Sequence, residues 1–223
     1  MPPIHNILGC HMNAYTPLDP AAVGAANEIM GRLDRLSETL ANARGYRALL
    51  EDLRDRDTSS VTEPHVSAIH MARSGFLRAA IGTIMAALDK RSRDRASVGQ
   101  IIHMFQTILA GPALAVLTDR WPNNSFGTTT LQQATTDWAS LVASVEFQEC
   151  KDFRDGVVGH TLIFATPSVP TDAYFRLHDA AEALTLQFYA ICGYGRPDFV
   201  ANRDRLTTQA KTFWDTYWLG MRN

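Results

Sequence analysis

The sequence contains few cysteines. Only three occur among its 223 residues, and Cys10, Cys150 and Cys192 stand far apart and without the spacing of a metal site. An odd number of widely separated cysteines does not make a disulfide framework, so we expect buried thiols in a reducing compartment. The N-terminal residues also lack the basic and apolar regions of a signal peptide. Together these absences predict a cytoplasmic protein.

Long apolar runs and a large charge of one sign are missing as well. The longest uncharged apolar run, residues 79–88, covers about half of the roughly 20 residues that a membrane-spanning helix needs. The formal net charge is -2 and the sequence pI is about 6.4. These values argue against a surface that coats nucleic acid broadly, but they allow a local basic patch. We therefore expect no membrane association.

Several recurring catalytic and structural patterns are absent. The sequence has no phosphate-binding glycine loop, no nucleophile elbow and no paired cysteines. It also shows no strand-type alternation, no repeat period and no linker long enough to separate two domains. A chain of this length can bury roughly 70% of its unfolded surface. We therefore predict an irregular lead-in at residues 1–18 and a single helical domain at residues 19–223.

The sequence does contain many apolar residues at helical spacing. They predict an all-α, up-and-down bundle of about five to six helices. The predicted helices cover residues 20–53 with a pause near Gly45, 64–88, 97–109, 130 through the 150s, 171–191 and 199–218, with a short segment at 114–117. Because Gly75, Gly82 and several alanines let neighbours approach closely, we expect the second helix to lie in the middle of the bundle.

One stretch, Phe153-Arg154-Asp155-Gly156-Val157-Val158-Gly159-His160, places an arginine, a carboxylate and a histidine within seven residues. An imidazole moves a proton near neutral pH and a guanidinium neutralises a phosphate oxygen, so the pair suits phosphodiester cleavage. On a straight helix Arg154 and His160 point about 120° apart, and a bend at the two glycines would bring them together. The alternative is an ordinary helix C-terminus, where both cations favour the negative end of the dipole.

This stretch resembles the signature of HEPN-domain proteins, in which an arginine and a polar residue precede a histidine. It is similar in particular to the abortive-infection branch, with an arginine-aspartate pair, apolar residues, a small residue and histidine. The helix end at residues 88–91, the serine at 97 and a new helix at 171 match that branch in context, so the resemblance covers roughly residues 20–220. It implies a helical bundle that pairs as a symmetric homodimer. The chain departs from the pattern at Gly156, where a basic residue is expected, and at Gly159, where an alanine is expected.

The resemblance implies a metal-independent endoribonuclease in phage defence or as a toxin, with RNA as substrate and no cofactor or metal. Arg154 and His160 would form the catalytic pair and Asp155 would support them. The RNA 2′-hydroxyl would attack the phosphate, and a two-fold dimer would supply the second histidine. A neutralising antitoxin or regulatory partner would fit such a role. The alternative is an inactive HEPN-like module that binds a partner protein or nucleotide, which the near-neutral pI and Gly156 favour.

Other polar groups have a functional and a structural interpretation. A basic cluster after the second helix can grip RNA phosphates, although a solvated connection is the favoured interpretation; its members are Lys90, Arg91, Arg93 and Arg95. His103 and His178 lie among apolar neighbours and are interpreted as packing histidines. The carboxylates of Glu146, Glu149 and Asp152 are interpreted as a solvated helix face rather than a metal site.

Overall fold

The computed structural model describes residues 20–59, 61–63, 65–89, 96–108, 127–158, 171–192 and 197–221. All regular secondary structure in these ranges is helical, which confirms the all-α prediction for them. The elements are α1 (Pro20–Arg54), α2 (His65–Ala87), α3 (Val98–Ile108), α5 (Gly127–Val142), α6 (Val145–Phe153), the π-helical turn η1 (Arg154–Val158), α7 (Thr171–Cys192) and α8 (Phe199–Met221). The predicted lead-in at 1–18 and the short segment at 114–117 lie outside the described residues.

Helix α1 begins at Pro20, the first-turn position at which proline costs no hydrogen bond. Its 35 residues extend for about 52 Å at 1.5 Å per residue. The expected pause near Gly45 does not occur, because α1 continues unbroken to Arg54. A glycine inside a helix costs roughly 1 kcal/mol, and the burial of Ala43 and Ala48 on either side of Gly45 offsets that cost.

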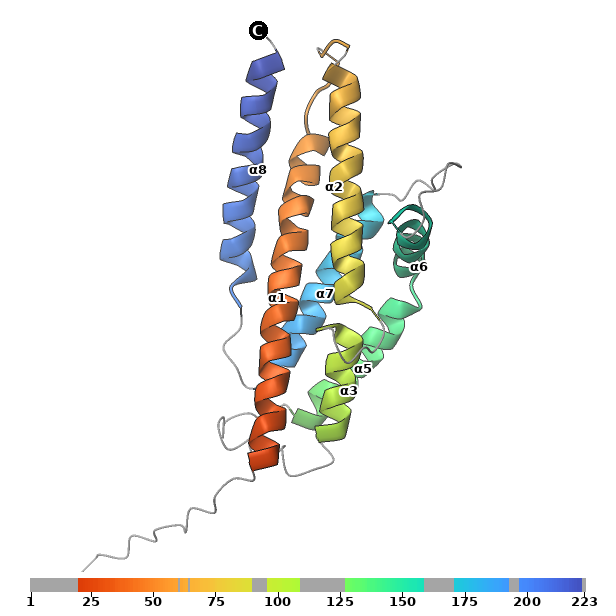
Figure 1. Cartoon of the computed structure of the whole chain (residues 1–223), viewed down its shortest axis with the longest axis vertical. Coiled ribbons are helices and arrows are strands. Elements are labelled where there is room, and N and C mark those ends of the chain that lie inside the picture. The colour runs from red at the N-terminus through yellow and green to blue at the C-terminus, as the bar shows by residue number, and fades with distance from the viewer. Residues whose placement is uncertain are drawn as a thin grey trace, which may run out of the picture.

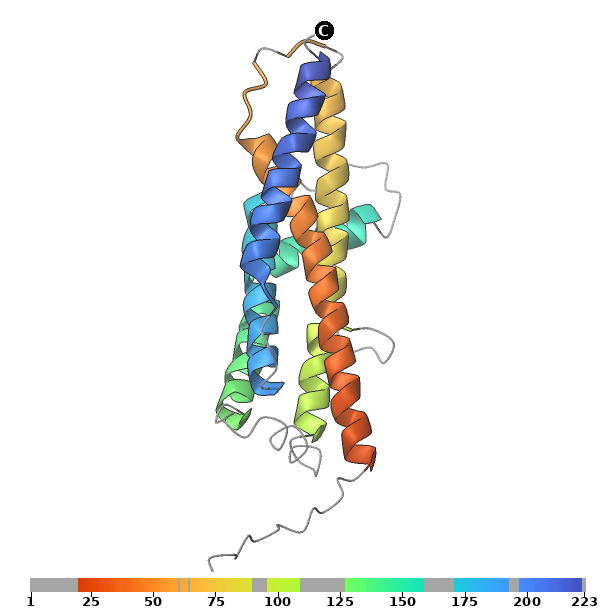
Figure 2. The ribbon, with the colours of Figure 1, turned by 90° about the vertical axis from the view of Figure 1, so that its left-hand side faces the viewer.

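The long helices alternate in direction. Figure 1 shows α2 beside α1 and antiparallel to it, with α3 continuing roughly in line below α2. Helices α5, α7 and α8 then run up, down and up again, while α6 crosses the bundle. Figure 2 shows the same alternation after a quarter turn, with α5 and α7 side by side in the lower half.

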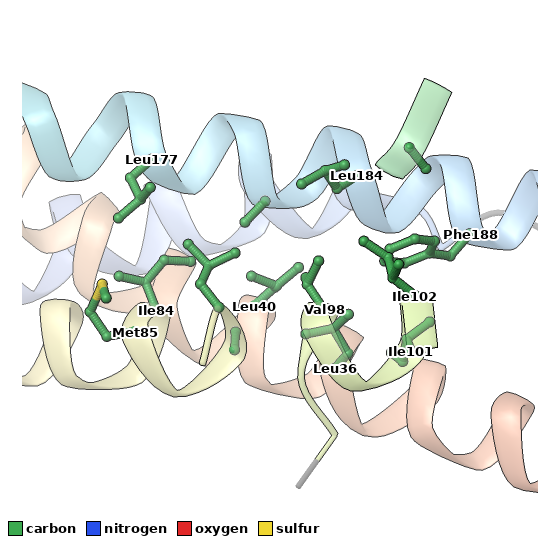
Figure 3. Close-up of a cluster of buried hydrophobic side chains, with 14 of the residues drawn as sticks. Leu36, Leu40, Ile84, Met85, Val98, Ile101, Ile102, Leu177, Leu184 and Phe188 are labelled. Carbon is green, nitrogen blue, oxygen red and sulfur yellow. The ribbon is translucent and has the colours of Figure 1, made fainter. Parts of the chain in front are cut away.

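The main hydrophobic core lies where α1, α2, α3 and α7 meet. Figure 3 shows aliphatic side chains from all four helices pointing toward one another, including Leu40, Ile84, Val98 and Leu177. Helix α7 is the central element, since most of its residues are buried. The expectation that the second helix is central is therefore wrong.

The reason lies in the glycines of α2. A methyl group added at Gly75 or Gly82 would meet no atom within 4 Å, so no neighbour uses the space that these glycines leave. Small residues permit a close approach but do not cause one. Large apolar side chains on a helix that is surrounded by others, such as Tyr174 and Phe188 in α7, mark the centre instead.

A second, smaller cluster joins α8 to α1 and α2. Trp214 is fully buried and its indole N–H donates a hydrogen bond to the carbonyl of Leu49 at 2.9 Å. Trp218 packs edge-on against Trp214, and Arg56 lies over the Trp218 ring. These contacts hold the C-terminal helix against the N-terminal one.

The predicted fourth helix is two helices. Ser144 interrupts it and caps α6, because its hydroxyl accepts a hydrogen bond from the Phe147 amide. The count is therefore seven α-helices among the described residues rather than five to six. Helix α3 does begin after a capping serine as predicted, with the Gln100 amide donating to Ser97 Oγ at 3.4 Å. Among the residues described, none of the helices is both long and apolar enough to cross a membrane.

Candidate functional site

The arginine of the singled-out stretch lies where the helix type changes. Helix α6 ends at Phe153, whose ring is buried against the main core. The next five residues, Arg154–Val158, form the π-helical turn η1, which packs against the C-terminal end of α2. Short π-helical segments occur frequently at functional sites. Helix α6 does end at Phe153, with Arg154 as its C-cap, and η1 continues the chain as one widened turn.

Gly156 does not create this turn. Its backbone is not in the left-handed region that favours glycine, and a methyl group at this position would meet no atom within 4 Å. The Cβ atom of an alanine would therefore fit at Gly156 without a clash. The predicted bend at the two glycines, which would bring Arg154 and His160 together, also involves Gly159, and both Gly159 and His160 lie outside the described residues.

The Arg154 guanidinium is held by two carboxylates. Its Nε and Nη2 atoms both lie 2.8 Å from Asp155 Oδ1, and its Nη1 atom lies 3.9 Å from Oδ1 of Asp89. The Arg154 side chain keeps 25% of its surface exposed. It is therefore positioned before any ligand binds and still reaches solvent.

Asp89 stands just beyond the C-terminal end of α2, where a negative charge is unfavourable because of the helix dipole. The positive charge of Arg154 compensates for this placement. The sequence alone suggested only that Asp89 partly cancels the charge of the basic cluster. No local pattern connects it to Arg154, because the two residues meet only through the packing of η1 on α2.

Asp155 also contacts Lys151, whose Nζ lies 3.4 Å from Asp155 Oδ2. The hydrogen bond from Arg154 lowers the pKa of the Asp155 carboxyl, and Lys151 adds to this effect. Asp155 is thus ionised at neutral pH and is a poor proton acceptor. It is suited to orient the arginine, which is the supporting role that the resemblance implies.

Arg154 and Lys151 line a cleft of about 880 Å³ at the junction of α2, α3, α5 and α6. Its volume is within the range of small-molecule sites. The remaining polar lining comes from Asp89 and Gln148, whose amide donates to Asp152 at 2.7 Å. The apolar lining consists of Met85, Leu88, Trp138, Ala139, Val142 and Phe147, with Gly99 at the start of α3. The cleft combines cationic groups with an apolar wall, which suits a ligand that has an anionic and an apolar part.

Three of the sequence-based assignments concern residues beyond the described part of the chain. His160, the predicted proton carrier, lies outside it, as does Gly159. The basic cluster at 90–95 also lies outside it. The structure therefore places Arg154 and Asp155 together, and the position of His160 relative to them stays a prediction.

A buried polar cluster between α1 and α7 was not recognised in the sequence. Arg44 and Glu182 form a bidentate ion pair in which both side chains are almost fully buried. The fully buried His178 lies beside them, with Nε2 3.3 Å from the carbonyl oxygen of Leu40. The signal was available, since Arg44 falls four residues after Leu40 on the core face of α1 and Glu182 falls among the buried residues of α7.

The pKa of His178 is lowered to about 3, chiefly by burial and also by the positive charge of Arg44. The imidazole is therefore neutral at physiological pH, with Nε2–H donating to the Leu40 carbonyl. Nδ1 has no hydrogen-bond partner among the described residues. The interpretation of His178 as a packing histidine agrees with this geometry.

His178, Asp179 and Glu182 offer ligand atoms that lie within 4.8 Å of one another. Both carboxylates are already paired, Glu182 with Arg44 and Asp179 with Arg47 at 2.5 Å. Two guanidiniums at the same carboxylates oppose the binding of a further cation. We therefore assign this cluster to the core and not to a metal site.

The carboxylates of α6 are also engaged with neighbouring side chains. Glu146 accepts a hydrogen bond from Arg176 at 2.9 Å, and Asp152 accepts one from Gln148. Asp152 is exposed and Glu149 is half-buried. This arrangement agrees with the interpretation of these residues as a solvated helix face.

Comparison with known proteins found no match for this chain among protein-family models, curated proteins or solved structures. The HEPN resemblance therefore stays a prediction from the motif.

Proposed function

We propose that the protein is a metal-independent endoribonuclease of the HEPN type that acts in the cytoplasm, in phage defence or as a toxin. The observation that carries the proposal is the placement of Arg154. It stands on a π-helical turn at a cleft of about 880 Å³, oriented by Asp155 and accompanied by Lys151. Two cations beside an apolar wall match an RNA strand, which presents phosphates and bases together.

The reaction would use the nucleophile that RNA carries. The 2′-hydroxyl oxygen attacks the adjacent phosphorus while a histidine accepts the hydroxyl proton. The guanidinium of Arg154 binds the phosphate oxygens and stabilises the additional charge of the phosphorane. The bond to the 5′-oxygen breaks, and a second histidine donates a proton to that leaving oxygen. The products are a 2′,3′-cyclic phosphate and a 5′-hydroxyl.

Each chain contributes one motif histidine, His160, to this scheme. A homodimer with two-fold symmetry supplies the second one, because an isologous interface brings the same residues of both copies together. Arg154 can reach such an interface, since its side chain is partly exposed. The active species is thus proposed to be the dimer.

One observation favours a second candidate function. Asp89 and Asp155 both engage Arg154, so a phosphate must compete with two carboxylates for the guanidinium. A HEPN-like module that binds a partner protein or nucleotide without cleavage would tolerate this weakening. The cleavage assay separates the two functions.

The test is incubation of the purified protein with structured RNA in excess chelator. The variants are Arg154→Ala and His160→Ala, and the matched control is Arg176→Ala, an arginine on α7 that is 62% exposed and does not line the cleft. We expect cleavage by the wild type and the control, a loss of at least about 100-fold in both motif variants, and no cleavage of DNA. RNA that stays intact with every version would refute the nuclease and leave the binding module.

A further inference from the structure

Trp138 forms an aromatic wall of the cleft that the motif does not explain. It lies in the last part of α5, is half-buried, and lines the cleft together with Arg154. Its ring packs edge-on against the buried Phe147 ring, with 6.3 Å between the centroids and an interplanar angle of 89°. A buried ring thus holds the indole in place.

Polar side chains of α6 and η1 line the same cleft one after another along the chain. Gln148, Lys151 and Arg154 are three residues apart, which is a rise of about 4.5 Å between successive members. A neutral amide is followed by an ammonium and then by a guanidinium. The amide can hydrogen-bond a base edge, and the cations can bind phosphates. The polar lining therefore changes from a neutral amide in α6 to two cations at Lys151 and Arg154, with Asp89 beside Arg154.

We infer that the cleft is a base-binding subsite: an unpaired RNA base next to the phosphate on Arg154 stacks on Trp138. This inference rests on the proposed function and adds the structural reason for substrate choice. A base in a duplex is covered by its neighbours and cannot enter, whereas an unpaired base can be turned out and stacked on an aromatic side chain. The protein should therefore cut RNA at unpaired nucleotides.

An alternative occupant would be an aliphatic anion such as a fatty acid. The aliphatic lining residues would suit it, but a rigid indole beside a hydrogen-bonding amide suits a flat ligand that has polar edges. The two neighbouring cations, Lys151 and Arg154, also suit the successive phosphates of a nucleotide chain better than the single carboxylate of a fatty acid. The nucleotide is therefore the occupant that the lining favours.

The test is a double-mutant cycle that combines variants of the protein with modified RNAs. The RNA is an oligonucleotide with one mapped cut site, in which each base flanking the cut is removed in turn to leave an abasic ribose. The proteins are the wild type, Trp138→Leu, Trp138→Phe and the control Phe213→Leu, which changes an exposed ring outside the cleft. Thermal unfolding of each variant shows whether it is folded.

For one abasic position we expect KM to rise about 5- to 150-fold with the wild type, the range for loss of one stacked base. Trp138→Leu should raise KM on intact RNA by a similar factor and should no longer respond to that abasic position. Trp138→Phe should lie between the two and Phe213→Leu should behave as the wild type. If removal of the base and substitution of Trp138 raised KM independently, so that their factors multiplied, the inference would be overturned while the nuclease would stay in place.

The same cycle is measured as binding, with 2′-O-methyl oligonucleotides that cannot be cleaved. If no version of the protein cuts RNA, the proposed function fails, but coupling between Trp138 and one base in the Kd values still supports the subsite. An absence of coupling, or no binding of either oligonucleotide, overturns it.

Discussion

Arg154 in η1 and Asp89 at the end of α2 face each other, with 3.9 Å between Nη1 and Oδ1. The pair brings the guanidinium of the motif to the cleft and neutralises part of its charge. An arginine held in this way needs little reorganisation to bind a phosphate, but the phosphate must displace a carboxylate. If the site binds phosphate as proposed, we expect Asp89 to influence its affinity for phosphate as well as the position of Arg154.

Replacing Asp89 with asparagine should strengthen phosphate binding, because it removes one competing charge. A partly exposed ion pair contributes about 0.2–1 kcal/mol, so we expect the Kd for single-stranded RNA to fall by about 1.4- to 5-fold at low salt. Asp172→Asn is the matched control, since this exposed carboxylate pairs with Arg54 outside the cleft. Fluorescence anisotropy with labelled RNA measures the effect. A weaker affinity in Asp89→Asn would mean that Asp89 chiefly positions Arg154.

Breaking the buried pair of Arg44 and Glu182 should destabilise the protein strongly. Either Arg44→Met or Glu182→Leu leaves one buried charge without its partner, at a cost of about 3–5 kcal/mol. The double variant leaves no isolated charge and should lose much less than the sum of the two. Urea denaturation measures all three, with Glu28→Gln as the control because Glu28 pairs with Arg32 at the surface. Additive losses would contradict strong coupling across the pair.

Acidification should destabilise the fold through His178. Its pKa is about 3 in the folded state, chiefly because of burial, against about 6.5 in the unfolded chain. Between these two values the unfolded state binds a proton that the folded state does not, so the free energy of unfolding falls as the pH is lowered from about 6.5 toward 3. Urea denaturation at several pH values measures this slope.

The variant His178→Gln isolates this contribution, because glutamine keeps an N–H group for the Leu40 carbonyl but does not titrate. Carboxylates titrate in both proteins, so the difference between the two slopes belongs to the histidine. Parallel slopes for the two proteins between pH 6.5 and 4.5 would contradict this, because they would show that His178 takes up its proton equally in the folded and unfolded states.

The thiols of Cys150 and Cys192 should be unreactive in the native protein. Burial raises the pKa of each to about 12, so almost no thiolate is present at pH 8. A Cys10→Ser background leaves these two cysteines as the reporters. A chromogenic disulfide reagent should react with neither over minutes in buffer and with both at once in denaturant. Rapid reaction without denaturant would show that α6 or α7 opens locally.

The helix break at Ser144 was missed because the apolar spacing continues across it, although the capping serine itself marks the break. Apolar residues continue at helical spacing on both sides of it, so the pattern predicted one helix from 130 onward. The stop is made by a capping serine and not by glycine or proline, and Glu146 in the first turn of α6 accompanies it. A serine followed by an acidic first turn is a helix start, and that start positions the helix that leads into the turn with Arg154.

The amino-acid sequence alone determined where most of the described residues are helical, since apolar spacing and capping residues act within a few turns. It also singled out Arg154 and Asp155, which are neighbours in the chain and stay together in the structure. Only the tertiary structure decided that α7 is the central helix, that Asp89 meets Arg154, and that Trp138 shares their cleft. Those relationships depend on how whole helices pack, because the residues concerned lie on different elements and local spacing carries no information about them.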